Sequence, residues 1–462
     1  MTDHRPKTPS STMAFNTAQQ TMLAAARGSG GRSKRILMVL PDLIPSEETA
    51  YAIDLALTLD SHGHAVRLIC GDGVWQNLLS AHQLDFQIMP EALQGLRSPL
   101  FVRRALKSLD TYGAEVVIGF ETGSLRLLNL IAHLRKIPQV LAFARAFDPI
   151  HHPGAPKIRL NRAVGGVIVP IQAMREILVN HYGIPAGLCE VVPPCADSRM
   201  ALSGPSEVES LWVERMPGFI FQRPDPNPYA ESDGAVLKED TPETRDDETR
   251  RLTVATAGRL MNDRGLEIFI ALVSELALKR PGIDFVIFGG GPDEAKLRKR
   301  IETLGLTARL LIVASPASWP ALFPSIDVFV WSSDEAGGEI PAVYAMGAGK
   351  PIVAVRGTSS LELCGEEEVA LLTEVNEEQL RIQKADGSRS HKQIQDARRR
   401  LGSLQVEGLK KTLAQVLANR GMAEKMGQQA KRHALKVFSR TRQYEELAQI
   451  LARFEKKAEV AV

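Results

Sequence analysis

Several features that mark specialised classes of protein are scarce or absent in this sequence. Its 462 residues contain only four cysteines, with no Cys-x-x-Cys pair and no histidine at zinc spacing, so a reduced chain without a structural metal is expected. No run of about 18 uncharged apolar residues occurs, so no membrane span is expected. The formal net charge of only +2 argues against bulk nucleic-acid binding. The first 33 residues lack the apolar core of a secretion signal, and a cytoplasmic protein is therefore expected.

The chain does contain a regular alternation of strand-like and helix-like segments. From Arg35 onward, this alternation is typical of a parallel sheet with helices on both faces. The expected strands form two groups, at 35–40, 64–70, 114–120, 138–144, 165–170 and 189–194, and at 251–260, 283–291, 308–315, 326–331 and 350–355. Two such groups predict an α/β protein with two Rossmann-like domains and a ligand site in the cleft between them.

The segment from Ser325 to Ala354 is the most informative in the chain. It predicts a buried strand over 328–331, a polar loop with Gly337 and Gly338, and a short helix with Pro341 in its first turn. Glycine lets the backbone approach a ligand, and free amides at a helix start can hold a phosphate. Carboxylates on the same loop can accept hydrogen bonds from hydroxyl groups. A phosphate beside a polyol suggests a nucleotide sugar, although an ordinary strand-loop-helix unit with a solvated acidic loop fits the residues equally.

This segment resembles the donor-site signature of the retaining GT-B-fold glycosyltransferases of group 1, which are similar to glycosyltransferase family 4. The matching residues, in order, are Asp327, Phe329, Val330, Ser333, Glu335, Gly338, Pro341, Ala345, Met346, Gly349, Lys350, Pro351 and Val353. Shorter matches extend the resemblance to roughly 35–197 and 252–454. The resemblance implies the GT-B fold, in which two Rossmann-like domains face each other across a cleft and a C-terminal helix returns to the N-terminal domain.

The resemblance also implies that the second domain binds the donor. Arg259 and Arg264 flank the turn after a strand and match a cationic pair that holds the donor's diphosphate, with Arg264 in the place of a lysine. Such guanidinium groups stabilise the charge on a departing diphosphate, although the residues alone also fit surface charges. Gly290 and Gly291 would bring the backbone close to the donor, or form a tight turn before a basic helix. Gly337 and Gly338 would contact the donor as well.

Glu335 and Glu339 are the candidate catalytic carboxylates, which would bind hydroxyl groups of the transferred sugar. The family pairs two glutamates with seven residues between them. Here Tyr344 occupies the second position, and Glu335 lies nine positions before it rather than eight. Either the loop carries an insertion, or Glu339 has taken over part of the role. Tyr344 is expected at the nucleotide, where it cannot act as a carboxylate acceptor.

The acceptor side departs further from the family. A glycine pair usually follows the first strand, and here the stretch Pro45–Glu48 takes its place. A histidine often follows the strand at 138–144, and here Ala144 stands there. His151 and His152 on a proline-rich loop are candidate substitutes, although loop histidines usually face solvent. Glu121 follows the strand at 114–120 and is a candidate at the same edge of the cleft.

Three further segments complete the expected organisation. Residues 1–34 are expected to form a flexible tail, and residues 198–251 a mobile acidic insertion, because 206–250 carries twelve acidic and five basic residues. The first domain is expected over 35–197, the second over 252–437, and the returning helix over 438–462. Within the first domain, Arg103, Arg104 and Lys107 could address anionic lipid at the inner membrane face or a charged acceptor, or form a solvated helix face.

The sequence therefore predicts a glycosyltransferase that moves a sugar from a nucleotide-sugar donor, with retention of configuration and without a metal or other cofactor. Its acceptor would be a glycan, a lipid-linked molecule or a small molecule, as in the synthesis of polysaccharides or glycolipids. The competing hypothesis is a non-catalytic relative that acts as a ligand-binding or interaction module. The missing second glutamate, glycine pair and histidine favour that alternative.

Overall fold

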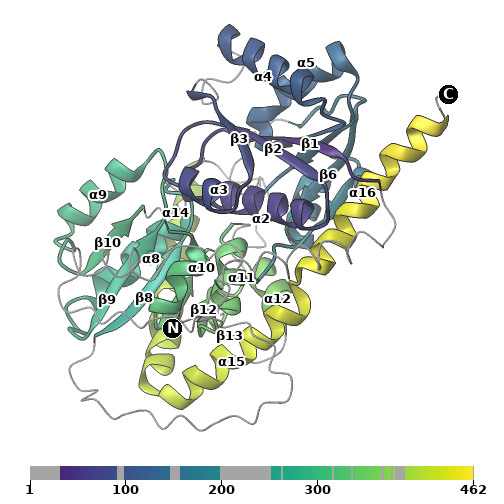
Figure 1. Ribbon diagram of the computed structural model, residues 1–462. Helices are drawn as coiled ribbons and strands as arrows, with labels where there is room; N and C mark the ends of the chain where they lie inside the picture. The colour runs from purple at the N-terminus through teal and green to yellow at the C-terminus, as the bar shows by residue number, and fades with distance from the viewer. Residues whose placement is uncertain are drawn as a thin grey trace, which may run out of the picture.

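A computed structural model describes residues 32–90, 98–145, 157–197, 251–261, 264–314, 317–333, 337–365, 369–375, 378–379 and 391–460. Most of the predicted tail and nearly all of the predicted acidic insertion lie outside these residues. The described chain forms two parallel sheets, one of seven strands in the order β3-β2-β1-β4-β5-β6-β7 and one of six strands in the order β10-β9-β8-β11-β12-β13. Figure 1 shows the two sheets as separate lobes, each flanked by helices.

The N-terminal domain holds the seven-stranded sheet. Its strands are β1 (Arg35–Val39), β2 (Ala65–Cys70), β3 (Asp85–Ile88), β4 (Val116–Phe120), β5 (Gln139–Ala142), β6 (Val164–Val169) and β7 (Cys189–Val191). Its helices are α2 (Glu47–Ser61), α3 (Gln76–Ala81), α4 (Pro99–Tyr112), α5 (Glu121–Arg135) and α6 (Gln172–Asn180). Strands β4, β5 and β6 are buried along their whole length, which is why they appear in the sequence as apolar runs rather than alternating ones, with Gln139 at the start of β5 as the polar exception.

The C-terminal domain repeats this plan around the six-stranded sheet. Its strands are β8 (Leu252–Ala257), β9 (Ile283–Phe288), β10 (Leu310–Val313), β11 (Val328–Trp331), β12 (Ile352–Ala354) and β13 (Ala370–Leu372). Its helices are α8 (Arg264–Leu276), α9 (Glu294–Thr303), α10 (Trp319–Leu322), α11 (Glu339–Gly347), α12 (Thr358–Cys364), α14 (His391–Ala418) and α15 (Arg420–Val437). The prediction of two Rossmann-like domains in an α/β protein is confirmed by these two sheets.

The last helix, α16 (Arg440–Val460), crosses back to the N-terminal domain and packs on α2 and β6. Figure 1 shows it in yellow beside the N-terminal lobe. Two glycines of β6 make this close packing possible. A Cβ atom at Gly165 would lie 2.2 Å from the ring of Phe454, and one at Gly166 would lie 2.8 Å from a methyl group of Ile450. Tyr444 of the same helix stacks on His62, with ring centroids 3.7 Å apart.

A buried ionic cluster joins this helix to the chain that crosses between the domains. Arg440 Nε donates to Asp197 Oδ2 at 2.9 Å, and its Nη1 donates to Thr58 Oγ1 at 2.7 Å. Asp54 on α2 accepts hydrogen bonds from the Cys195 amide at 2.7 Å and from Gln443 Nε2 at 2.8 Å. Burial raises the pKa of Asp54 to about 6, although Arg440 acts in the opposite direction. The cluster therefore depends on Arg440 to keep a buried carboxylate ionised.

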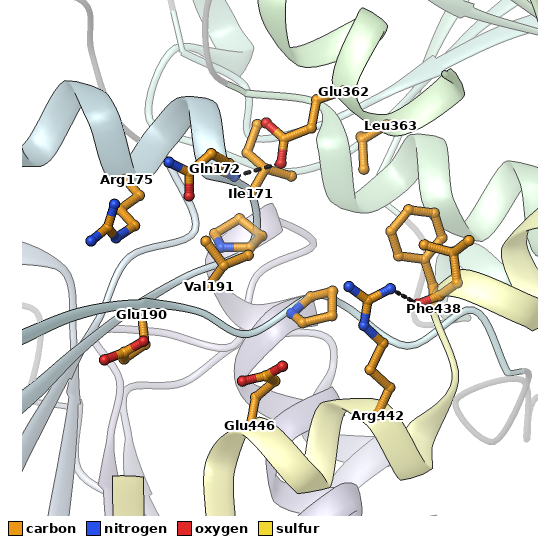
Figure 2. A pocket seen from close by; sticks show the side chains of 13 residues that line it. Ile171, Gln172, Arg175, Glu190, Val191, Glu362, Leu363, Phe438, Arg442 and Glu446 are labelled. Atoms are coloured by element: carbon orange, nitrogen blue, oxygen red, sulfur yellow. Dashed lines mark hydrogen bonds between the residues drawn. The ribbon is translucent and has the colours of Figure 1, made fainter. Parts of the chain in front are cut away.

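A second joint between the domains lies at the start of α6. Glu362 on α12 accepts hydrogen bonds from the backbone amides of Gln172 at 2.5 Å and Ala173 at 2.7 Å. A carboxylate of the C-terminal domain thus caps a helix of the N-terminal domain. Figure 2 shows this contact at the edge of a pocket of about 470 Å³ between α6, β7, α12 and the corner where α15 meets α16. This pocket lies at the domain junction beside the crossover chain.

Replacing Glu362 by alanine should lower the free energy of unfolding by about 1 kcal/mol, because the first amides of α6 lose their carboxylate cap. Urea titration of the variant and of a matched control, Glu302→Ala on the exposed face of α9, would measure this difference. Added salt should reduce it, since the carboxylate acts on the helix dipole through partly solvated space. Equal stability of the two variants would contradict the capping role.

Candidate functional site

The carboxyl ends of the two sheets face each other at the domain junction. The Gly290 amide in the turn after β9 donates to the Pro45 carbonyl oxygen after β1 at 2.8 Å. The Arg259 amide after β8 donates to Glu47 Oε2, at the start of α2, at 2.7 Å. In parallel α/β sheets, this edge is where ligands bind. The candidate site is therefore the region where these turns of the two domains meet.

Arg259 is the centre of the contact between the domains. Its guanidinium group lies 3.1 Å from Asp42 Oδ2 and 3.8 Å from Glu48 Oε2. Its side chain is only 17% exposed. The cation predicted to hold the donor's diphosphate is thus paired with carboxylates of the N-terminal domain in this conformation. Arg264, its predicted companion, is the first residue of α8, and its side chain lies outside the described residues.

The glycines of the predicted donor turns allow two turns to pack directly against each other. A Cβ atom at Gly289 would lie 1.9 Å from the Gly258 carbonyl oxygen, and one at Gly291 would lie 2.3 Å from the Leu260 carbonyl oxygen. A Cβ atom at Gly290 would lie 3.1 Å from the ring of Pro45. Tight packing of these turns therefore accounts for the glycines, and contact of Gly290 and Gly291 with a nucleotide stays a prediction.

The two glycines directly before α11 pack against the side chain of Trp331. Trp331 Nε1, at the end of β11, donates to the Gly337 carbonyl oxygen at 3.0 Å. Gly338 adopts a φ of +87°, which favours glycine, and a Cβ atom there would lie 2.9 Å from the Trp331 indole nitrogen. Among the predicted loop residues, Glu335 lies outside the part of the chain that the structure describes.

The carboxyl group of Glu339 lies at the start of α11, where the sequence predicts that a phosphate would bind. Its Oε1 accepts the Gly337 amide at 2.9 Å, and the side chain is completely buried at the start of α11. Burial raises the pKa of Glu339 to about 7, although hydrogen bonds from the Glu339 and Gly337 amides lower it. The amides before Pro341 are thus capped by the chain's own carboxyl group, which a donor's phosphate would have to displace.

The raised pKa of Glu339 predicts a change of stability with pH. The folded protein holds this proton more tightly than the unfolded chain, because the pKa is about 7 rather than 4.5. The resulting stabilisation is complete below pH 4.5 and is lost as the pH rises to about 7.

Glu339→Gln has no such proton to lose, so its melting temperature should fall less than that of the wild type as the pH rises from 4.5 to 7. Melting curves at several pH values would test this, with Glu302→Gln as the exposed control. Parallel pH profiles for Glu339→Gln and the wild type would contradict the assignment.

The side chain of Tyr344 is buried on a different side of α11 from that of Glu339. It is 2% exposed, and the charges of Asp54, Arg440 and Asp197 all act on its hydroxyl group. Burial is the main cause of its strongly raised pKa, followed by Asp54. Tyr344 therefore belongs to the ionic cluster that joins α2 and α16. Contact between Tyr344 and a nucleotide stays a prediction, and it would require this cluster to open.

Glu121 is the acceptor-side candidate that the structure brings into the junction. Its Oε1 accepts the Ala144 amide at 2.9 Å. Its backbone φ of +58° is unusual for a residue with a side chain, a strain that is concentrated at functional sites. Burial, together with the neighbouring Glu48, raises the pKa of Glu121 to about 8. His151 and His152, the other candidates on this side, lie outside the described residues.

Arg145 is a candidate that the sequence reasoning missed. It directly follows Ala144 after β5 and is 7% exposed. Its Nη1 donates to Met261 Sδ at 3.8 Å, and its Nε would lie 3.6 Å from a Cβ atom at Gly337. A side chain of the N-terminal domain thus reaches both donor-side loops. Its position immediately after a strand, at the edge where ligands bind, was the available signal.

Two other expectations concern metals and membranes. Among the described residues, no group of three or more His, Cys, Asp or Glu side chains is arranged to hold a metal ion. None of the helices in that part of the chain is both long enough and apolar enough to cross a bilayer. On α4, Phe101, Ala105 and Leu109 are buried, while Arg103 and Lys107 are exposed and Arg104 is half-buried. Metal independence and contact of α4 with a membrane both stay predictions.

Comparison with known families agrees with this geometry. The family model for Glycosyl transferases group 1 matches residues 251–384, and the model for Glycosyltransferase Family 4 matches residues 49–199. Together they match more than half of the chain and one domain each. The chain belongs to the group 1 glycosyltransferases. The family resemblance drawn from the sequence is confirmed, while retention of configuration stays a prediction.

Solved structures are similar to this chain over nearly its whole length. HepE from Anabaena, in complex with UDP and glucose, is 17% identical, covers 91% of this chain and 100% of its own, and gives a TM-score of 0.62. Sucrose-phosphate synthase from Thermosynechococcus elongatus is 13% identical, covers 93% of this chain and 100% of its own, and gives a TM-score of 0.59. These likenesses support the GT-B fold that the sequence predicts.

A curated relative is the 2-deoxystreptamine glucosyltransferase of Streptomyces kanamyceticus, which is 26% identical over 214 residues. The match covers 45% of this chain and 47% of the relative, so the chain spans about half the length of that protein.

Proposed function

We propose that the protein transfers a sugar from a nucleotide-sugar donor to an acceptor, with retention of configuration at the anomeric carbon. The observation that carries the proposal is the meeting of Arg259, the glycine turns and Glu339 at the carboxyl ends of both sheets, in a chain of a glycosyltransferase family. The donor would bind at the C-terminal domain, and the acceptor would enter at the N-terminal domain.

The donor's diphosphate would take the positions that the chain's own carboxylates now hold. At Arg259 it would replace Asp42 and Glu48, and at the start of α11 it would replace Glu339. A diphosphate is a stronger acceptor than one carboxylate, because it carries more charge and more oxygen atoms at the same donors. Donor binding would therefore separate the contacts between the two domains.

Once displaced from the amides, Glu339 would be free to accept hydrogen bonds from the sugar's hydroxyl groups. As the bond from the anomeric carbon to the diphosphate breaks, negative charge develops on the leaving group. Arg259 and the amides of α11 would stabilise this charge, and Arg145 would approach it from the N-terminal domain. Positioning and charge stabilisation supply most of the catalysis in such a site, so no strong nucleophile is needed.

A non-catalytic ligand-binding or interaction module is the second candidate function. It is favoured by the pairing of Arg259 with Asp42 and Glu48, by the capping of α11 by Glu339, and by the enclosure of Tyr344. A module of this kind would use a nucleotide to open the domains rather than to react.

A panel of UDP-, GDP- and ADP-sugars would separate the two candidates. Transfer or hydrolysis of any of these donors, with the product's anomeric configuration read by NMR, tests the enzyme and retention together. Binding of a nucleotide without turnover across the panel would favour the module. Activity that is lost on treatment with a chelator and restored by a divalent cation would contradict metal independence.

A further inference from the structure

The described residues that line the polar pocket at the domain junction include none of those assigned to the donor or the acceptor. The pocket has a volume of about 470 Å³, within the range of about 300–1,000 Å³ that is usual for small-molecule sites. Three parts of the chain line it, namely the start of α6 with β7, the end of α12, and the corner where α15 meets α16 (Figure 2). Its buried apolar side chains include Ile171, Leu363 and Phe438.

Arg175 of α6 gives this pocket a positive charge in a fixed orientation. The residue is half-buried, and its guanidinium group donates from Nε to the Cys189 carbonyl oxygen at 2.7 Å and from Nη2 to the Ala186 carbonyl oxygen at 2.9 Å. These carbonyl groups orient the guanidinium group but do not neutralise it, and no carboxylate of the described residues pairs with it. A guanidinium group has five N–H donors, and two are used here, so three remain for a ligand.

Arg442 and Glu446 of α16 add a second cation and a carboxylate to the lining. They are four residues apart, a spacing at which two side chains of opposite charge can pair on a helix. Arg442 Nη1 instead donates to the Val437 carbonyl oxygen at 3.0 Å, and Figure 2 shows its guanidinium group turned away from Glu446. Glu446 is half-buried and has no ion-pair or hydrogen-bond partner among the described residues. Both groups therefore remain available to a ligand.

The other two charged side chains of the lining already have partners. Glu190 pairs with Arg453 at 2.6 Å, and Glu362 accepts the first amides of α6. The lining thus offers two guanidinium groups to an anion and one carboxylate to hydrogen-bond donors. Because three carboxylates share the lining, a ligand of high negative charge would be repelled. A ligand that combines one acidic group with several hydroxyl groups fits both kinds of partner, since a hydroxyl group can donate to Glu446 as well as accept from a guanidinium group.

We propose that this pocket binds a small polyhydroxylated anion, with its acidic group against Arg175 and its hydroxyl groups against Glu446 and Arg442. The acidic group is a carboxylate in a sugar acid and a phosphate in a phosphorylated polyol, and both present paired oxygen atoms to a guanidinium group. Because α6, α12 and α16 all contribute to the lining, the bound anion touches both domains and the returning helix.

The test compares four small probes on the full chain by ligand-observed NMR. They are gluconate, sorbitol 6-phosphate, their neutral counterpart sorbitol, and methyl phosphate, which lacks the hydroxylated chain. At least one of the two polyhydroxylated anions should bind about tenfold more tightly than sorbitol and than methyl phosphate, because it makes both sets of contacts. The tighter of the two identifies the acidic group. That anion should also raise the melting temperature, since it binds the folded protein across both domains.

Substitutions in the lining should separate the two sets of contacts. Arg175→Gln should remove most of the preference over sorbitol, and Glu446→Ala most of the preference over methyl phosphate. Arg442→Gln, an exposed change that leaves the Arg175 contacts intact, should also weaken the anion. Arg300→Gln, an exposed change on α9, should retain both preferences. Melting curves would establish that each variant folds, and Arg442→Gln remains decisive if Arg175→Gln does not.

Equal binding of sorbitol and both anions, or no binding of any probe, would overturn the proposal. So would either preference if it survived its own substitution in a folded variant. A preference that is lost in Arg259→Ala but kept in Arg175→Gln would place the anion in the donor site and overturn it as well. None of these measurements requires turnover, so they test the pocket independently of the proposed sugar transfer.

Discussion

Replacement of Arg440 by leucine should lower the free energy of unfolding by about 3–5 kcal/mol, the usual cost of removing one partner from a buried ion pair. Arg440 is 6% exposed and Asp54 is 1% exposed, with 3.4 Å between Arg440 Nη2 and Asp54 Oδ1. Without Arg440, the carboxylates of Asp54 and Asp197 lose their nearest described cation. The Thr58 hydroxyl group loses a hydrogen bond as well.

The loss of stability in Arg440→Leu should also depend on pH, and it should be smaller at low pH, where the carboxyl group of Asp54 is protonated. Burial raises the folded-state pKa of Asp54 from 3.8 to about 6, and loss of Arg440 removes the main influence that lowers it. The carboxyl group of the variant should therefore stay protonated to a higher pH than in the wild type. The variant should regain part of its stability below pH 6, where a neutral Asp54 is tolerated.

Urea titration at two pH values would measure both effects. Arg432→Leu, an exposed change on α15, is the matched control. The double variant Asp54→Asn with Arg440→Leu should recover stability relative to Arg440→Leu alone, because asparagine can still accept the Cys195 amide but carries no charge. A loss in Arg440→Leu no larger than that in Arg432→Leu would show that the cluster does not hold the domains together.

Most strands of the two sheets could be predicted from the sequence because they are buried on both faces, whereas the edge strands β3 and β13 are only partly buried and were not predicted. Strand β4 (Val116–Phe120) is fully buried and appears as an uninterrupted apolar run, and in β9 (Ile283–Phe288) the apolar run is broken only by Asp284. The C-terminal helical region was predicted less fully. The helical pattern of the sequence is clear only from Ser403, whereas α14 begins at His391, because the first turns of that helix are polar and carry no apolar stripe.

The ion pairs and hydrogen bonds within the candidate site could not be predicted, because they join residues that are far apart in the sequence. Arg259 pairs with Asp42 across 217 positions, and its amide bonds to Glu47 across 212. The family resemblance predicts Arg259 and Glu339 at the donor site but gives no sign that carboxylates of the chain itself occupy the guanidinium group of Arg259 and the amide of Gly337. Arg145 was overlooked because the resemblance directed attention to a histidine position that Ala144 fills. Local sequence patterns predict which residues lie at the carboxyl edge of each sheet. Which charged side chains pair there depends on how the two domains pack, and the sequence does not show that packing.

The largest expected effect on ligand binding is that of Arg259→Ala, which should weaken nucleotide-sugar binding by roughly 1.5–3 kcal/mol, the scale of a charge-assisted hydrogen bond. Loss of the guanidinium group removes the described cation nearest the expected diphosphate. It also leaves the carboxylates of Asp42 and Glu48 buried without that partner, and these then repel the incoming anion. The loss should therefore fall in the upper part of that range.

Glu48→Gln provides the opposite change at the same contact. Donor binding is proposed to displace Glu48 from Arg259, so neutralising Glu48 should tighten the binding of UDP, GDP or ADP. Titration calorimetry on the wild type, Arg259→Ala, Glu48→Gln and the exposed control Arg298→Ala on α9 would measure all four affinities. Unchanged nucleotide affinity in a folded Arg259→Ala would exclude Arg259 from the donor site. A weaker affinity in Glu48→Gln would mean that this carboxylate supports the donor rather than competing with it, since removal of a competing anion can only leave Arg259 more available to the diphosphate.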